Sequence, residues 1–213
     1  MLYCSLNSFL PLFICLRLNC NFLRDAALAS IIVLRQATSG ATALPALNQL
    51  LGTRRSSPLQ VVELGAGCGI VGIALAQMLE QAQVLLTDLP EVEEIVMRNI
   101  YDNHPQRDSS VTFQTLDWDE PGDLCNGSID LILVSDCTYN ADSLPPLVAV
   151  LGRLARSSPD AVVLVALKRR HDSEAIFFDL MRSAGFSAVQ TTYQLPAQHG
   201  EKDAIELYCY RLD

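Results

Sequence analysis

The stretch at residues 61–75 reads VVELGAGCGIVGIAL, and it decides the fold. Its first four residues predict a short β-strand that ends at a glycine-rich turn over residues 65–69. The apolar run that follows predicts a helix over residues 70–80. A strand, a glycine turn and a helix in this order place the free N–H groups of the helix start at the end of the strand, where a ligand can bind.

Strands and helices alternate along the rest of the chain. Near-continuous apolar strands separated by helices predict a parallel sheet with helices on both faces. The last two strands have no helix between them, so we expect them to pair antiparallel. The sequence therefore predicts an α/β fold with a seven-stranded, mostly parallel sheet whose last strand is antiparallel. The other strands are expected over residues 84–87, 111–116, 131–135, 161–167, 188–195 and 204–211, and the other helices over residues 90–103, 143–156 and 172–184.

The composition excludes several classes of protein. The chain has 213 residues, of which 50% are apolar and 18% charged, so it can bury one sizeable core and is not a disordered chain. A formal net charge of −9 argues against nucleic-acid binding, which usually needs a basic face. No apolar run reaches the ~18 residues of a membrane-spanning helix. We expect a monomeric enzyme that acts on a small molecule or on a basic protein, away from membranes.

Cysteine usage and the first residues bear on the compartment. The chain has seven cysteines, no CxxC spacing and three histidines, so we expect no metal site and reduced thiols in a cytoplasmic protein. Residues 9–16, FLPLFICL, resemble the core of a secretion signal, but no Lys or Arg precedes them and no small-residue cleavage site follows. We assign residues 1–58 to an N-terminal segment of uncertain order and residues 59–213 to the domain.

The glycine turn and the next strand end carry the first candidate ligand-binding residues. Glycine lets the backbone approach a ligand where a Cβ atom would clash, which favours Gly65 and Gly67 together with Ala66 between them. Glu63 stands two residues before the first glycine, and the third glycine comes one residue too early for the GxGxxG fingerprint of dinucleotides. Asp88 ends the second strand, where a carboxylate in nucleoside-binding sheets accepts the ribose hydroxyls; capping of the next helix is the alternative.

Two later strands bring further polar and aromatic residues to the same edge of the sheet. Trp118, the only tryptophan, follows the third strand and could border an adenine ring; a place in the core is the alternative. The fourth strand ends at Ser135 and is followed by Asp136 and Tyr139. A carboxyl group and a phenol three residues apart in a turn can point into one pocket, although Asp136 could instead cap the turn while Tyr139 packs.

Four motifs in this order resemble one enzyme family. They are VVELGAGCGIVGIAL at residues 61–75, VLLTDLPEV at 84–92, LDW at 116–118 and DLILVSDCTY at 130–139. They are similar to motifs of the class I seven-β-strand methyltransferases, and above all to family 16, the METTL21-like protein-lysine methyltransferases, which includes fungal enzymes that modify translation elongation factors. The resemblance implies a Rossmann-like methyltransferase domain at residues 59–213 that uses S-adenosylmethionine.

By position, the resemblance implies a substrate-orienting, catalytic role for Asp136 and Tyr139 and a cofactor role for seven other residues. The family usually has a tryptophan about 25 residues before the glycine turn, whereas residues 38–43 of this chain read TSGATA. The implied activity is N-methylation of a lysine in a protein such as an elongation factor. A small-molecule methyltransferase and a non-catalytic or truncated family member are the alternatives. The cofactor residues are Glu63, Gly65, Ala66, Gly67, Asp88, Trp118 and Ser135.

Overall fold

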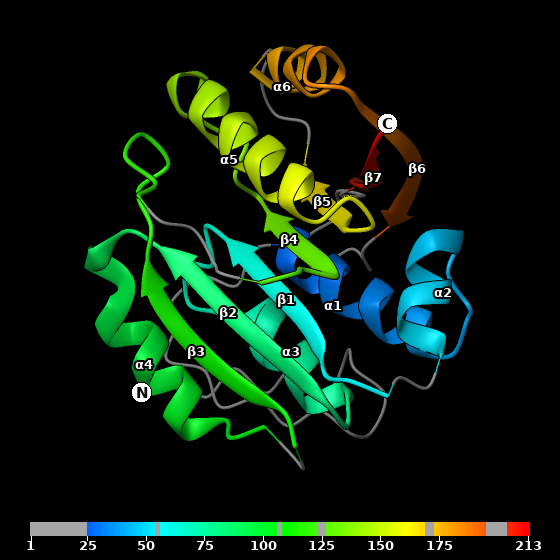
Figure 1. Cartoon of the computed structure of the whole chain (residues 1–213), viewed down its shortest axis with the longest axis vertical. Coiled ribbons are helices and arrows are strands. Elements are labelled where there is room, and N and C mark those ends of the chain that lie inside the picture. Colours follow the sequence, from blue (N-terminus) through cyan, green and yellow to red (C-terminus); the bar gives the residue numbers. More distant parts are fainter. Residues whose placement is uncertain (1–24, 54–55, 106–107, 123–126, 169–172, 195–203) are drawn as a thin grey trace.

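The computed structural model describes residues 25–53, 56–105, 108–122, 127–168, 173–194 and 204–213. They form three layers, in which a central sheet separates two groups of helices (Figure 1). The sheet has seven strands in the order β3-β2-β1-β4-β5-β7-β6. β7 runs antiparallel to both of its neighbours, and the other neighbouring pairs are parallel. The predicted α/β class and the antiparallel last strand are therefore confirmed.

Each strand lies within two residues of its predicted bounds at either end, because burial on the sheet faces produces the apolar runs that the sequence shows. β4 has the predicted bounds. The strands are β1 (Leu59–Leu64), β2 (Ala82–Asp88), β3 (Ser110–Thr115), β4 (Leu131–Ser135), β5 (Val162–Leu167), β6 (Phe186–Gln194) and β7 (Ala204–Leu212).

Helices cover both faces of the sheet, and each face has its own hydrophobic cluster. α1 to α4 pack on one face, and α5 and α6 pack on the other. The predicted helix at residues 90–103 is divided, because its first turn, which begins at a proline, is a 3-10 helix. The helices are α1 (Asp25–Thr38), α2 (Pro45–Gly52), α3 (Ile70–Met78), η2 (Pro90–Val92), α4 (Glu93–Asp102), η3 (Ala141–Ser143), α5 (Leu144–Ser157) and α6 (Ser173–Ser183).

α1 and α2 lie in the stretch for which the sequence analysis assigned no elements. α1 contacts α2, α3, β5 and β7, and Ile31 and Leu34 are buried in the cluster that it shares with the sheet. At its first residue, Asp25 lies 3.7 Å from the ammonium group of Lys168, directly after β5. The segment at residues 1–21, on which the question of a secretion signal depends, lies outside the described residues.

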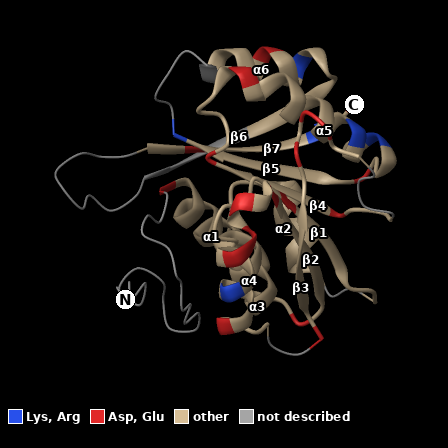
Figure 2. Cartoon of the chain, turned by 90° about the vertical axis from the view of Figure 1, so that its left-hand side faces the viewer, with Lys and Arg blue, Asp and Glu red and all other residues tan. Residues whose placement is uncertain are grey.

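One face of the sheet is open at its β3 edge. The connection from β3 to β4 has no helix among its described residues, 116–122 and 127–130, and α5 and α6 pack further along the sheet (Figures 1 and 2). The side chains that point to this open face are largely polar and solvent-exposed, among them Gln83, Thr112 and Gln114. Alternation of polar and apolar residues in β3 thus matches a strand that is covered on one side only.

The carboxyl ends of the central strands meet at one edge of the sheet. Leu64, the last residue of β1, pairs with Thr87 of β2 and with Val134 of β4. The loops that leave these three strands therefore start side by side, which is where parallel α/β sheets bind ligands. None of the helices in the described ranges is both long enough and apolar enough to cross a membrane.

Candidate active site

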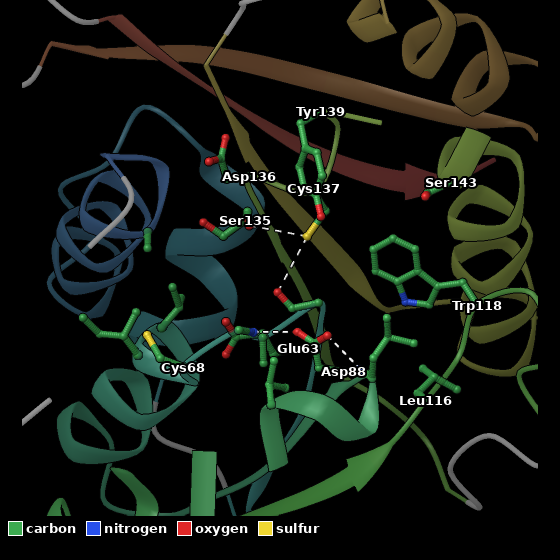
Figure 3. Close-up of a pocket in the computed structure, with 18 of the residues that line it drawn as sticks. Glu63, Cys68, Asp88, Leu116, Trp118, Ser135, Asp136, Cys137, Tyr139 and Ser143 are labelled. Atoms are coloured by element: carbon green, nitrogen blue, oxygen red, sulfur yellow. Dashed lines mark hydrogen bonds between the residues drawn. The ribbon is translucent and has the colours of Figure 1, made fainter. Parts of the chain in front are cut away.

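A cavity of about 530 Å³ opens at this edge of the sheet. Its walls come from the glycine turn after β1, the ends of β2 and β4, and the segment after β3 (Figure 3). All nine residues that the sequence analysis selected line it, although they come from four separate segments of the chain. The nine are Glu63, Gly65, Ala66, Gly67, Asp88, Trp118, Ser135, Asp136 and Tyr139.

The glycine turn has no room for a side chain at its first position. Gly65 has φ +63°, and a Cβ atom there would lie 2.6 Å from Cys137 Sγ and 3.1 Å from the ring of Trp118. Gly67 also has a positive φ, +58°, but a Cβ atom there would have no atom within 4 Å. The first glycine is thus required by close packing as well as by backbone conformation, whereas the second is required by conformation alone.

Asp88 closes the floor of the cavity. Its Oδ2 accepts a hydrogen bond of 2.7 Å from the N–H of Gly67, and its Oδ1 accepts one of 2.7 Å from the N–H of Leu89. A carboxylate has about four lone-pair positions, so both oxygens keep acceptor capacity toward the cavity. Asp88 therefore fits the expected position for two ribose hydroxyls while it also stabilises the glycine turn.

Glu63 is buried beneath the turn. Its Oε2 accepts a hydrogen bond of 2.7 Å from the N–H of Gly72, in the first turn of α3. Burial raises the pKa of Glu63 to about 8; the bond from Gly72 opposes this rise, and the nearby charge of Asp88 adds to it. At neutral pH Glu63 thus carries a proton. Its carboxyl group can donate one hydrogen bond and accept others, unlike the acceptor-only carboxylate of an ionised glutamate.

Two buried side-chain polar atoms in the described residues lack a hydrogen-bond partner, Trp118 Nε1 and Ser135 Oγ, and both belong to residues that line this cavity. Leaving a buried donor or acceptor unsatisfied costs about 1–3 kcal/mol, so native proteins rarely tolerate it without a reason. A polar ligand with a ring and hydroxyl or amino groups would satisfy both. The residues present therefore fit a nucleoside cofactor such as S-adenosylmethionine.

Asp136 and Tyr139 lie on the β4 side of the cavity, opposite Asp88 (Figure 3). Asp136 is buried, with 9% of its surface exposed, and its N–H donates a 2.9 Å hydrogen bond to the carbonyl of Ala166 at the end of β5. Tyr139 is 64% exposed and so forms part of the mouth of the cavity. The two residues thus line the same cavity, one of them buried and the other at its mouth.

Sequence reasoning missed several lining residues. Cys137 lies between the two predicted catalytic residues, and its thiol is 3.5 Å from the carbonyl of Leu64 and 3.7 Å from that of Gly65. Burial raises the pKa of this thiol, so it remains a neutral donor. Its position between Asp136 and Tyr139, directly after an apolar strand, could have indicated a role in packing. Ala27 of α1 also lines the cavity, and an alanine in an apolar helix gives no such signal.

Comparison with known families adds an independent observation. The family model described as lysine methyltransferase matches residues 20–184, which is more than three quarters of the chain. The chain belongs to the lysine methyltransferase family. The family match begins before α1, so it includes the helices that precede the glycine turn.

Named relatives of this lysine methyltransferase family member come from animals and fungi. Protein N-lysine methyltransferase METTL21A of Danio rerio is 38% identical over 136 residues, covering 63% of this chain and 60% of that protein. Protein-lysine N-methyltransferase EFM6 of Saccharomyces cerevisiae is 27% identical over 164 residues, covering 70% of this chain and 65% of that protein. The chain thus spans under two thirds of the length of these relatives.

Solved structures share the fold of this family member. Magnesium protoporphyrin IX methyltransferase from Synechocystis, solved with bound S-adenosylmethionine, superposes with a TM-score of 0.56 at 19% identity, covering 90% of this chain and 86% of that one. Precorrin-6y C5,15-methyltransferase from Geobacter metallireducens gives 0.58 at 13% identity, covering 79% and 88%. At such identities the likeness concerns the fold, and it confirms the Rossmann-like methyltransferase sheet.

Proposed function

We propose that this protein is an S-adenosylmethionine-dependent protein-lysine N-methyltransferase that acts on a protein such as a translation elongation factor. The observation that carries the proposal is one cavity lined by Asp88 on one side and by Asp136 and Tyr139 on the other. The family match supports lysine as the acceptor. A further relative, EEF1A lysine methyltransferase 3 of Mus musculus, 34% identical over 57% of this chain, supports an elongation factor as the substrate.

The cofactor side of the cavity is assigned to the glycine turn and its neighbours. The oxygens of Asp88 accept the ribose hydroxyls, and Trp118 borders the adenine ring with its indole N–H available as a donor. Ser135, whose hydroxyl has no partner, faces the same ligand. When bound, S-adenosylmethionine supplies a methyl group on a sulfonium with a good leaving group, so the protein has to supply alignment above all.

The substrate side orients the lysine amine. A lysine must lose its proton before it can attack, and burial lowers its pKa whereas a neighbouring carboxylate raises it. Asp136 is therefore better suited to accept a hydrogen bond from the amine and hold it in line than to act as a strong base. Tyr139 at the mouth packs against the lysine stem, and its ring adds a cation–π contribution of ~0.5–2 kcal/mol.

We further propose that the protein acts as a monomer in the cytoplasm and not on nucleic acid or at a membrane. The net charge of −9 supports the part of this proposal that concerns nucleic acid and anionic membranes, because polyanions would be repelled. It also suits a substrate protein whose methylated segment is basic. Gel filtration with light scattering measures the oligomeric state directly.

The decisive experiment incubates the purified protein with labelled S-adenosylmethionine and a cell extract, followed by mass spectrometry of labelled bands. We expect one labelled protein that carries methyllysine. Asp88→Ala should weaken cofactor binding by ~1.5–3 kcal/mol, the value of hydrogen bonds to a charged group. It should also lower the melting temperature without cofactor, because the bonds from Gly67 and Leu89 are lost, but the protein should still fold. Label that appears only in small molecules, or no cofactor binding by the wild-type protein, would contradict the proposal.

A further inference from the structure

A buried amide on α4 contacts the glycine turn from behind. The side chain of Asn99 is fully buried, and its Nδ2 donates a 2.8 Å hydrogen bond to the carbonyl of Cys68. Cys68 lies within the turn and lines the cavity, whereas Asn99 does not reach the cavity. A polar side chain inside an otherwise apolar layer is stabilised only when it is hydrogen-bonded, so the position of Asn99 and that of the turn depend on each other.

The turn needs such an anchor because glycines flank Cys68. Gly67 has φ +58° and Gly69 has φ +77°, and glycine adopts positive and negative φ values about equally readily. The orientation of the peptide planes on both sides of Cys68 is therefore not fixed by clashes of a Cβ atom at residues 67 and 69. Hydrogen bonds hold the N–H groups of Ala66, Gly67 and Gly69, which donate to the carbonyl of Thr87, to Asp88 and to the carbonyl of Ala66, respectively. Asn99 instead holds a carbonyl, and so fixes the orientation of a peptide plane.

The two kinds of anchor differ in their relation to a ligand. The Gly67–Asp88 bond ends on a residue that lines the cavity, so a ligand that binds Asp88 shares this acceptor with the turn. The donor of the Asn99–Cys68 bond belongs to a residue that does not line the cavity, so a ligand in the cavity does not compete for this donor. A binding loop that keeps one conformation before binding loses less entropy when the ligand arrives, which raises its affinity.

We propose that Asn99 is a positioning residue for the cofactor site, and that it presets the glycine turn in the conformation that binds S-adenosylmethionine. The proposal rests on the proposed function, because it takes the cavity to be the cofactor site. It assigns a cofactor-affinity role to a residue of α4 that contacts no cavity atom. The buried residues of α4 are Val96 and Asn99, which lie one helical turn apart. Val96 packs in the hydrophobic cluster between the helices and the sheet, so the same face of α4 carries Asn99 toward the turn.

Asn103 provides a matched control. It follows α4, is buried as well, and its Nδ2 donates a 2.8 Å hydrogen bond to the backbone carbonyl of Asn99. Its amide therefore also satisfies a backbone carbonyl, but one that belongs to α4 and not to the turn. Asn99→Asp and Asn103→Asp each replace an amide by a carboxyl group of the same shape, so the first loses the bond to Cys68 and the second the bond to the carbonyl of Asn99. If either aspartate variant fails to fold, Asn99→Ala and Asn103→Ala make the same comparison.

The test titrates S-adenosylmethionine against each variant and follows the fluorescence of Trp118, the only tryptophan and a cavity-lining residue. We expect both variants to melt at a lower temperature than the wild type, and only the Asn99 variant to bind S-adenosylmethionine about tenfold more weakly. Equal affinity of the Asn99 variant and the wild type would overturn the proposal, as would an equal loss of affinity in the Asn103 variant. A wild-type protein that binds no S-adenosylmethionine would instead overturn the proposed function.

Discussion

Asp136 has a backbone conformation that few side chains adopt. Among the described residues it is the non-glycine residue with a positive φ, at 57°. Aspartate and asparagine tolerate this left-handed region better than other side chains, at a cost of about 1–3 kcal/mol that the surrounding structure must offset. The bond from its N–H to Ala166 helps to hold it there. Such strain concentrates at functional sites, which agrees with the proposed role of this residue.

The substitution Asp136→Asn separates chemistry from conformation. Asparagine accepts the same backbone geometry, so we expect the fold and the melting temperature to change little. Methyl transfer should fall strongly, because an uncharged amide oxygen is a weaker acceptor for the amine than a carboxylate and aligns it less well, while S-adenosylmethionine binding stays within about tenfold. Single-turnover transfer measured beside a cofactor titration distinguishes these effects. Wild-type transfer by this variant would place the substrate pocket elsewhere.

The two glycines of the turn offer a paired test of close packing. Gly65→Ala adds a Cβ atom that overlaps Cys137 Sγ, whereas Gly67→Ala adds one in open space, and both change a residue with positive φ. We expect Gly67→Ala to lower the free energy of unfolding by about 1–2 kcal/mol and Gly65→Ala by a further 1–3 kcal/mol. Urea unfolding of both variants measures the difference. Equal losses would mean that Cys137 moves aside without cost.

At the scale of elements, β1 and α3 are joined across the glycine turn by the bond from Gly72 to Glu63. A Cβ atom at Gly72 would lie 2.7 Å from Glu63 Oε2, so this close approach also requires a glycine. The carboxyl group thus joins the end of β1 to the start of α3. A raised pKa in the folded protein means that the native state binds this proton more tightly than the unfolded chain does.

A pH dependence of stability follows from Glu63. The pKa rises from 4.5 to about 8 on folding, so between these values the native state binds a proton that the unfolded state has lost. The contribution of Glu63 to the free energy of unfolding is therefore highest at low pH. It falls between about pH 4.5 and 8, by at most ~1.4 kcal/mol per pH unit. Glu63→Gln cannot titrate and should flatten this slope in urea unfolding at several pH values. An unchanged slope would contradict the assignment to Glu63.

An element can be predicted from the sequence when it is buried on one side only, or when it is a strand that is apolar throughout. Other elements cannot be predicted in this way. β4 and the residues after it were predictable, because a continuous apolar strand must end at polar residues. α1 was not, because it is buried on nearly all sides and its apolar residues show no helical period. Asn99 was not predictable either, since a polar residue in a surface helix usually faces solvent. Its partner, Cys68, is 31 residues away, and only the fold brings the two together.

At the scale of the whole molecule, the N-terminal helices belong to the same core as the sheet. Leu34 of α1 is fully buried among residues of α3 and the strands, so Leu34→Ala should lower the free energy of unfolding by about 2–5 kcal/mol. A chain that starts at residue 22 retains α1, and we expect it to melt cooperatively. A chain that starts at residue 59 lacks α1 and α2, and we expect that it does not melt cooperatively. Calorimetry of both chains tests the domain boundary, and cooperative melting of the shorter one would show that the sheet needs no α1.

β7 is the last strand along the chain, yet it lies between β5 and β6 inside the sheet. During synthesis on a ribosome, the N-terminal part of the chain emerges first, and β5 and β6 appear before the strand that pairs with both. Until residues 204–212 have emerged, both strands present unpaired edges, which invite association with other nascent chains. A premature stop codon before this strand would therefore yield an incompletely folded chain, which chaperones would bind and proteases would degrade.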